Sequence, residues 1–270
     1  MKNLLVYINP EKEFLDNNDL LVKLQIDNSL GLGWKKEEIL LATNFPYEYA
    51  GVKATIVGDD NYCSHHPNCN KISAIVDLFQ KRLISEDLYW FHDLDAYQME
   101  ADIDPKIGNQ DMAIVVDHTF VPYGDKYPGT RNWTMGVIYF NHHCQDIFNA
   151  VRYEMDRRRC SDDMGLKIAE YLQRKTLFPK QLKALNLTYN FQVKATICLD
   201  HRLRYRHFGT QYDAVEKPIK VIHFPLKTRW YRPEHGETNN IDFCIRGKNP
   251  MKQPLVSPRL LEIFKKYGIS

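Results

Sequence analysis

The chain lacks a membrane-spanning apolar run and a large net charge, and we expect no secretory leader. No apolar stretch approaches the roughly 20 residues that a transmembrane helix needs, and polar residues interrupt segment 1–14 too early for a signal peptide. We therefore expect a cytoplasmic protein with no membrane partner. The net charge is only +2, so a polyanionic partner would have to meet a local patch of charge.

Cysteine is also too sparse for a disulfide framework. Six cysteines are scattered through 270 residues, which predicts reduced, packed thiols. One segment, CSHHPNC, nevertheless gathers the metal-ligating residue types Cys63, His65, His66 and Cys69. Its spacing is irregular for zinc and no second pair follows. A polar surface loop is the preferred interpretation, with a zinc site as the alternative.

The first half of the chain alternates strand-like and helix-like segments. Aliphatic and β-branched runs predict strands at 4–9, 37–44, 53–59 and 88–92, and apolar periodicity predicts helices at 18–33 and 71–84. This alternation predicts an α/β fold with a mostly parallel, doubly wound sheet flanked by helices. Ligands of such a sheet bind beyond the carboxyl ends of its strands.

The second half predicts strands at 111–122 and 133–142, then helices at 145–159 and 162–175. A loop-rich tail follows from about residue 185, with a strand-like segment at 221–225 and a last helix near 257–268. We expect a core over residues 1–200 and an elaborated carboxyl-terminal extension over 201–270.

Two aspartates, Asp93 and Asp95, follow the predicted strand at 88–92. In an extended segment their side chains would point to one face, where two carboxylates repel unless a cation lies between them. Magnesium and manganese take oxygen ligands from a few carboxylates and from substrate phosphates. The pair therefore predicts a divalent-metal site. Ordinary turn aspartates are the alternative.

Four further segments accompany this D-x-D and the lysine-bearing helix before it: TMGVIYFN (134–141), DDMGLK (162–167), LNLTYN (185–190) and VIHFPLKTRWY (221–231). Together and in this order they resemble motifs of the GT-A glycosyltransferases, in particular the retaining, glycogenin-like group. The resemblance implies a GT-A, Rossmann-like fold and a hexosyltransferase. It also implies a nucleoside diphosphate sugar as donor, with uridine as the preferred nucleoside, Mn²⁺ or Mg²⁺ as cofactor, and a retaining outcome.

The resemblance assigns the metal site and its neighbour. Asp93, Asp95 and His223 would hold the cation, because carboxylates and a neutral imidazole suit manganese-like ions. Lys227 would lie against the diphosphate and stabilise the charge that grows on the leaving group. Without the D-x-D, His223 would be read as a packed or hydrogen-bonded histidine, and Lys227 as a solvated charge.

The resemblance also places residues around the donor and the acceptor. The donor residues would be Tyr7 and Asn9 near the base and ribose, with Lys71 and Gly136 beside them. Asp162 matches the family's acidic position near the sugar acceptor, and Asp163 is the second choice. Ser161, Asp162 and Asp163 also form a good amino-terminal helix signal, so we expect a capping role whichever function holds.

The acceptor is suggested by three basic and aromatic clusters, at 152–159, 200–209 and 227–236. Arginines that neutralise phosphates, interleaved with rings that stack on bases, suit a nucleic acid; pairing with nearby acids is the alternative. A compact glycosyltransferase of this build is similar to phage enzymes that glycosylate hydroxymethylcytosine, or its glucosylated form, in DNA. Double-stranded modified DNA is the predicted partner, with a glycan or protein acceptor as the alternative.

Two rival functions stay open at this point. A metal-dependent nucleotidyltransferase or phosphohydrolase would also use Asp93 and Asp95, but it should supply carboxylates for a second metal. The available ones are Asp102, Asp104 and Asp117. A non-catalytic nucleic-acid-binding protein would use only the arginine clusters.

Overall fold

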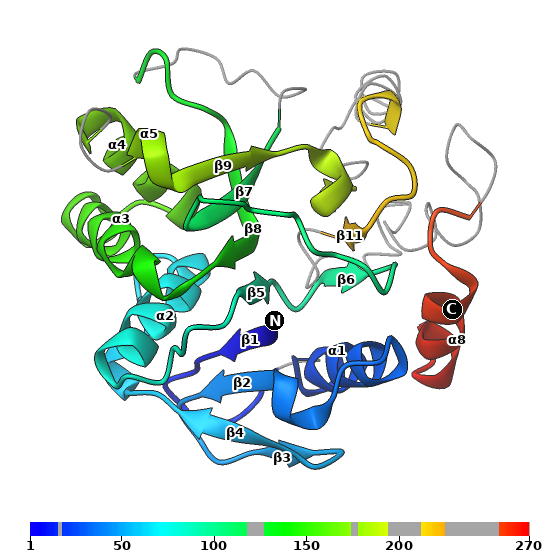
Figure 1. Ribbon diagram of the computed structural model, residues 1–270. Helices are drawn as coiled ribbons and strands as arrows, with labels where there is room; N and C mark the ends of the chain where they lie inside the picture. The colour runs from blue at the N-terminus through cyan, green and yellow to red at the C-terminus, as the bar shows by residue number, and fades with distance from the viewer. Residues whose placement is uncertain (16–17, 118–126, 174–177, 194–211, 225–253, 270) are drawn as a thin grey trace, which may run out of the picture. The chain divides into compact units, whose positions relative to one another are not determined.

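The computed structural model describes residues 1–15, 18–117, 127–173, 178–193, 212–224 and 254–269. Eight strands form one mixed sheet (Figure 1). Their order across the sheet is β3 (Glu48–Tyr49), β4 (Val52–Ile56), β2 (Ile39–Thr43), β1 (Lys2–Tyr7), β5 (Tyr89–His92), β8 (Trp133–Phe140), β7 (Met112–Val116) and β9 (Leu182–Leu185). The α/β class predicted from the sequence is confirmed.

Strand direction differs between the two halves of the sheet. β1 runs parallel to β2 and β5, and β2 runs parallel to β4, as the alternation of strands and helices predicts. β8 is antiparallel to both β5 and β7, whereas β9 is parallel to β7. The chain passes from β7 to β8 without a crossover helix in the described residues, and antiparallel neighbours need none. Every residue of β5, β7 and β8 is buried, which explains their nearly continuous apolar sequences.

Three helices pack together as a layer against this sheet: α2 (Asn70–Gln80), α3 (Gln145–Arg158) and α4 (Asp162–Gln173). Their apolar faces and the strands share one core cluster, which includes Ile75, Phe148 and Leu166. The chain also forms a short helix, α5 (Phe178–Gln181), and the 3₁₀ turns Lys36–Glu38, Asp59–Asn61, Pro67–Cys69, His142–Cys144 and Leu187–Tyr189.

Helix α2 ends at Gln80, four residues before the predicted end at 84. Arg82 takes a left-handed conformation, with φ of 58°. The amides of Arg82 and Leu83 donate to the carbonyls of Phe79 and Leu78, at 3.0 and 2.8 Å. These bonds form a Schellman cap, which stops the helix although no glycine marks its end.

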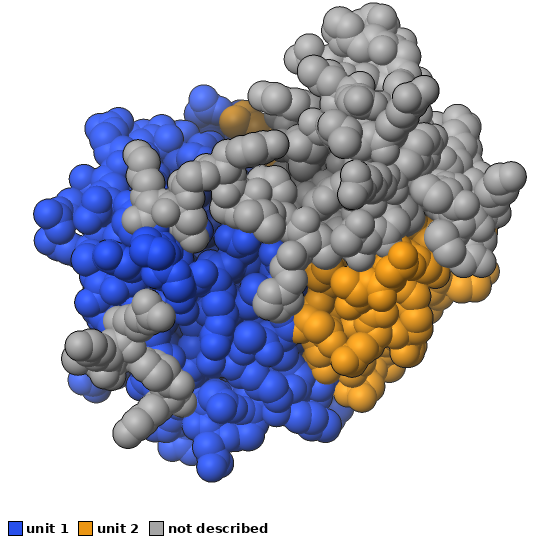
Figure 2. Space-filling view, turned by 90° about the horizontal axis from the view of Figure 1, so that it is seen from above, with its two compact units in different colours: residues 1–14, 35–93, 104–185 blue, residues 15–34, 94–103, 186–270 orange. Residues whose placement is uncertain are grey.

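The chain divides into two compact units. The first spans residues 1–14, 35–93 and 104–185 and holds the large sheet; the second spans 15–34, 94–103 and 186–270 (Figure 2). The second unit contains α1 (Asn18–Gly31), α8 (Pro258–Lys266) and a three-stranded sheet of β10 (Phe191–Gln192), β11 (Val221–His223) and β6 (Ala96–Gln98). The predicted boundary at residue 200 lies outside the described residues.

Buried amides of α1 hold the second unit together. Gln25 Nε2 donates to the carbonyls of Leu94 and Ala96, both at 2.9 Å, and Asn28 Nδ2 donates to the carbonyl of Gln98 at 2.9 Å. These bonds attach the backbone on both sides of Asp95 to helix α1. In the part of the chain that the structure describes, no helix is both long and apolar enough to cross a membrane.

Candidate functional site

Asp93 directly follows β5, as the sequence predicts. Its backbone amide donates to the carbonyl of Gly136 in β8, at 2.8 Å. Leu94 and Asp95 form a turn, so the extended segment that was expected there does not form. The turn forms because Leu94 is buried and the side-chain amide of Gln25 donates to the Leu94 carbonyl. Each carboxylate therefore has its own set of partners.

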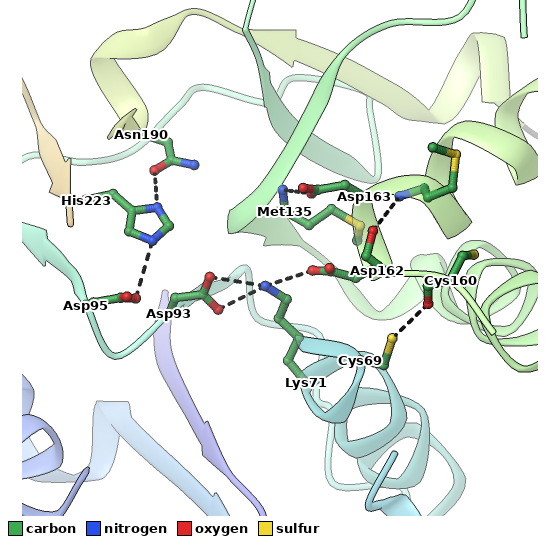
Figure 3. Close-up of polar contacts among 12 residues, drawn as sticks. Cys69, Lys71, Asp93, Asp95, Met135, Cys160, Asp162, Asp163, Asn190 and His223 are labelled. Atoms are coloured by element: carbon green, nitrogen blue, oxygen red, sulfur yellow. Dashed lines mark hydrogen bonds and ion pairs between the residues drawn. The ribbon is translucent and has the colours of Figure 1, made fainter. Parts of the chain in front are cut away.

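The carboxylate of Asp93 lies against the ammonium of Lys71, in the first turn of α2 (Figure 3). Lys71 Nζ is 2.9 and 3.2 Å from the two Asp93 oxygens and 2.8 Å from Asp162 Oδ2. Lys71 and Asp162 are buried, whereas the Asp93 side chain is 29% exposed. Burial alone would lower the pKa of Lys71, but Asp162 and Asp93 outweigh it and raise that pKa. Lys71 is a buried charged bridge, not a solvated lysine.

The acidic start of α4 carries out two tasks. Ser161 caps the helix as expected, because its Oγ accepts from the amide of Met164 at 3.4 Å. Asp162 and Asp163, in the first turn, reach farther. Asp162 pairs with Lys71, and Asp163 Oδ1 accepts from the amide of Met135 in β8, at 2.7 Å. The start of α4 is thereby tied to both α2 and the sheet.

Asp93 and Asp162 thus contact the ammonium of Lys71, and the nearby charge of Asp163 also acts to raise the pKa of Lys71. Burial and the charge of Asp162 raise the pKa of Asp163 to about 7, against the opposing effects of Lys71 and the Met135 amide. Asp163 is exposed as a residue, which limits the effect of burial and leaves the neighbouring charge of Asp162 as the stronger physical cause. Asp163 is thus able to gain or lose a proton near neutral pH.

Asp95 lies against His223 in the second unit, where both side chains are buried. His223 Nε2 is 3.3 Å from Asp95 Oδ1, and His223 Nδ1 is 3.0 Å from Asn190 Oδ1 (Figure 3). The pairing of β11 with β6 sets this contact, since His223 is opposite Ala96, next to Asp95. If Nδ1 donates to the Asn190 oxygen, the lone pair of a neutral imidazole faces a carboxylate. That arrangement places two potential ligands of a cation, an imidazole nitrogen and a carboxylate oxygen, side by side.

Asn190 is a site residue that sequence reasoning missed. It ends the segment LNLTYN, which carried part of the resemblance, but no role was assigned to it. Its side chain is buried and orients the imidazole of His223 from the side opposite Asp95. The signal in the sequence that could have identified Asn190 was its place as the polar last residue of this motif.

Tyr7 and Asn9 lie at the carboxyl end of β1. The Tyr7 ring packs on Phe14, with centroids 4.8 Å apart, and on Phe45 at 6.1 Å. Asn9 is buried, and its side-chain amide donates to the carbonyl of Glu13 at 2.7 Å. In the structure, Asn9 shapes the loop after β1 and Tyr7 belongs to an aromatic cluster.

Polar residues after the neighbouring strands were also missed. Asn44 follows β2 and donates through Nδ2 to the carbonyl of Asn9, at 2.8 Å, and to Asp59 Oδ1, at 3.0 Å. Asp59 follows β4 and pairs with Lys12 at 2.7 Å. Polar residues after three adjacent parallel strands meet at one edge of the sheet, and this recurrence was the signal that could have identified them.

The remaining site predictions have different outcomes. Gly136 contributes its carbonyl to the amide of Asp93. Lys227 lies outside the described residues.

Two of the carboxylates considered for a second metal are paired with lysines: Asp104 with Lys106 at 2.8 Å and Asp102 with Lys220 at 3.7 Å. Among the described residues, Asp102, Asp104 and Asp117 belong to no three-residue group that could hold a metal, so the second-metal site of a nucleotidyltransferase or phosphohydrolase does not form there.

Two of the four arginines in the cluster at 152–159 pair with acids within α3. Arg158 Nε is 2.8 Å from Glu154 and Arg152 Nε is 3.7 Å from Asp156. Pairing with acids, the alternative to nucleic-acid binding, is therefore what the structure shows for these two arginines. The clusters at 200–209 and 227–236 lie outside the described residues.

Segment CSHHPNC is the expected polar surface loop only in part, since Ser64, Pro67 and Asn68 are exposed but the two cysteines are not. Cys63 and Cys69 are buried, and His65 lies against both thiols. The loop folds inward because Asn70 accepts from the amide of Cys63 and the core closes over the two sulfurs.

Comparison with solved structures identifies the fold. Galactosyltransferase LgtC in complex with donor and acceptor sugar analogs matches 97% of this chain and 100% of its own, with a TM-score of 0.56 and 13% identity. An active-site mutant of LgtC matches 83% and 87%, with a TM-score of 0.53 and 14% identity. Glycosyltransferase GlyE of Streptococcus pneumoniae matches 86% of this chain and 56% of its own, with a TM-score of 0.51 and 13% identity. Neither a family model nor a curated protein matches the amino-acid sequence. The chain has the mixed α/β fold of GT-A glycosyltransferases.

Proposed function

We propose that this chain is a metal-dependent hexosyltransferase that moves a sugar from a nucleoside diphosphate sugar, preferably the uridine form, to a hydroxyl acceptor. The observation that carries the proposal is the buried contact of Asp95 with His223, on the segment that directly follows Asp93. His223 Nε2 and Asp95 Oδ1 are 3.3 Å apart, and an imidazole nitrogen and a carboxylate oxygen are both ligands of divalent cations. The GT-A fold supports sugar transfer as the use of such a site.

Asp93, Asp95 and His223 are the residues proposed to hold the cation. Two carboxylates and one imidazole suit Mn²⁺ and also Mg²⁺, which takes its remaining ligands from phosphate and water. When bound, the ion offsets the charge of the diphosphate as it leaves. Asn190 holds the ring of His223, and Lys71 holds the carboxylate of Asp93. These two contacts orient the ligands before the donor arrives.

Other residues are proposed to bind the donor and to approach the acceptor. Tyr7, within its aromatic cluster, offers a ring for the base, and the edge formed by Asn9, Asn44 and Asp59 offers polar groups for the ribose. Lys227 remains the predicted diphosphate lysine. Asp162 and Asp163 remain the predicted acceptor-side acids, and the pKa of Asp163, raised to about 7, suits a group that takes up a proton. Retention of configuration rests on the family resemblance alone.

The acceptor is proposed from the sequence. Hydroxymethylcytosine, or its glucosylated form, in double-stranded DNA exposes a hydroxyl in the major groove, which an enzyme can reach while contacting phosphates. Two of the three basic clusters that suggested this acceptor remain candidates for those contacts. A glycan or protein hydroxyl is the alternative acceptor.

The donor site is tested by calorimetric titration of uridine diphosphate with and without Mn²⁺. Binding should require Mn²⁺ and should weaken at least about tenfold in His223→Ala and Asp95→Ala, because each removes one ligand. His143→Ala is the matched control, since His143 is an exposed histidine elsewhere. No Mn²⁺-dependent binding of uridine, guanosine or thymidine diphosphate would exclude the proposed site, as would unchanged binding in both ligand variants.

The reaction is tested by product analysis. Uridine diphosphate sugars are incubated with hydroxymethylated DNA, glucosylated DNA and a glycan panel, and sugar incorporation is measured by mass spectrometry. Asp93→Ala should abolish transfer. If the wild type forms no glycosylated product and Asp93→Ala still binds DNA, the protein is a nucleic-acid-binding protein instead.

A further inference from the structure

The segment between the 3₁₀ turn Asp59–Asn61 and α2 brings two thiols and an imidazole together. Cys63 Sγ lies 3.2 and 3.3 Å from the two ring nitrogens of His65, and Cys69 Sγ lies 4.0 Å from His65 Nε2. One ligand atom from each of the three residues lies within 4.8 Å of the other two. Both cysteines are free and buried, while His65 reaches the surface.

The backbone holds this cluster in place. The amide of Cys63 donates to Asn70 Oδ1 at 2.7 Å, and the amide of Cys69 donates to the carbonyl of His66 at 2.9 Å. Pro67 begins the short 3₁₀ turn that places Cys69 at the start of α2. Backbone hydrogen bonds thus fix the positions of the two cysteines without a metal, which is the preorganisation expected of a ligand set.

We propose that Cys63, His65 and Cys69 bind one borderline-soft divalent ion, with Zn²⁺ as the best fit, and that water completes a tetrahedron. Zinc bonds of about 2.3 Å to sulfur and about 2.0 Å to nitrogen place tetrahedral ligand atoms roughly 3.5–3.8 Å apart. The observed separations from His65 need to change by only a few tenths of an ångström. Binding converts both thiols to thiolates and releases their two protons to solvent.

Thiolates distinguish this ion from the one proposed at Asp93, Asp95 and His223. Sulfur ligands select zinc, whereas carboxylates accept magnesium and manganese. The zinc would serve to hold the loop rather than the donor. The ion would therefore steady the start of α2, which carries Lys71. As a thiol, Cys69 donates through Sγ to the carbonyl of Cys160, at 3.2 Å, and this bond is given up when the thiol becomes a thiolate.

The first experiment is metal analysis of the full chain, purified under reducing conditions and exposed to Zn²⁺ before extensive dialysis. We expect one zinc per chain, and a loss of at least tenfold in affinity in Cys63→Ser, Cys69→Ser and His65→Ala. Cys160→Ser is the matched control, because its thiol is outside the ligand set although its carbonyl contacts Cys69. No retained zinc in the wild type would overturn the proposal. Loss of zinc in Cys160→Ser would overturn the three-residue assignment.

A second measurement covers the case in which a cysteine variant does not fold. Cobalt substituted into the wild-type chain should show the ultraviolet charge-transfer band of thiolate ligands and the visible bands of a tetrahedral ion. Octahedral cobalt without thiolate bands, or a Cys63–Cys69 disulfide in the freshly reduced chain by mass spectrometry, would contradict the site. Neither result depends on uridine diphosphate binding, so the zinc and donor proposals can fail separately.

Discussion

Lys71 Nζ lies 2.8 Å from Asp162 Oδ2, and both side chains are buried. The contact joins the first turns of α2 and α4, which lie far apart in the sequence. The same ammonium also contacts Asp93 after β5. The Lys71 ammonium thereby connects Asp93, which is proposed to hold a metal, with Asp162, which is proposed to lie near the acceptor.

Replacing Lys71 with Met should destabilise the fold strongly. The change keeps the bulk of the side chain but leaves the buried carboxylate of Asp162 uncompensated, which typically costs about 3–5 kcal/mol. Urea unfolding at neutral pH measures the loss. Adding Asp162→Asn to Lys71→Met should recover part of it, because the unpaired charge is then gone.

Lys81→Met is the control for this prediction. Lys81 pairs with Asp77 one turn away on α2, at 2.8 Å, but its side chain is 41% exposed. An exposed pair of this kind contributes about 0.2–1 kcal/mol. Equal losses of stability in Lys71→Met and Lys81→Met would contradict the bridging role of Lys71.

Asn190→Ala should weaken metal-dependent donor binding without removing a metal ligand. The variant loses the group that orients His223, and removal of such an outer partner typically lowers metal affinity about 10–100-fold. The Mn²⁺ concentration needed for half-maximal uridine diphosphate binding measures the effect. Asn186→Ala is the control, because Asn186 caps the neighbouring 3₁₀ turn. An unchanged Mn²⁺ requirement in Asn190→Ala would remove Asn190 from the site.

Asp163 should make stability fall as the pH rises from about 4 to about 7. Its pKa rises from 3.8 in the unfolded reference to about 7 in the fold, so in this window the folded chain binds a proton that the unfolded chain has lost. Stability declines where the folded state holds more protons, and the effect is flat outside the window. Asp163→Asn keeps an acceptor for the Met135 amide but cannot titrate.

The free energy of unfolding of Asp163→Asn, relative to wild type, should therefore rise across that pH range. Carboxyl NMR titration of the wild type measures the pKa directly. A value near 4 for Asp163, with parallel stability curves, would show that Asp162 does not perturb it.

Gly165→Ala should destabilise the packing of α4 on α3. A Cβ at Gly165 would lie 2.6 Å from Met155 Cγ and 3.2 Å from the carbonyl oxygen of Val151. Alanine favours the helix by about 1 kcal/mol, but overpacking costs about 1–3 kcal/mol, and the Val151 carbonyl is fixed in α3. Thermal unfolding should show a net loss of about 1 kcal/mol. In a Met155→Ala background the loss should shrink, and an undiminished loss there would contradict the overlap with Met155.

Local sequence patterns predicted much of the fold. Apolar runs and helical periodicity located β1, β2, β4 and β5 as well as α1, α3 and α4, because strand and helix periods are properties of neighbouring residues. The end of α2 was misplaced, since its cap depends on the backbone conformation of Arg82 rather than on a glycine. The antiparallel direction of β8 was also missed, because direction depends on how the chain connects β7 to β8.

By itself, the sequence determined the kinds of groups at the candidate sites: an aspartate directly after a buried strand, a histidine on a later strand, and two cysteines flanking two histidines. Only the tertiary structure decided their partners. Strand pairing set His223 beside Asp95, and helix packing brought Lys71 to Asp162. The amino-acid sequence gives the identity of each residue and the periodicity of polar and apolar residues around it. Which distant residues meet depends on strand order and helix packing, and these minimise the free energy of the whole fold rather than of any one segment.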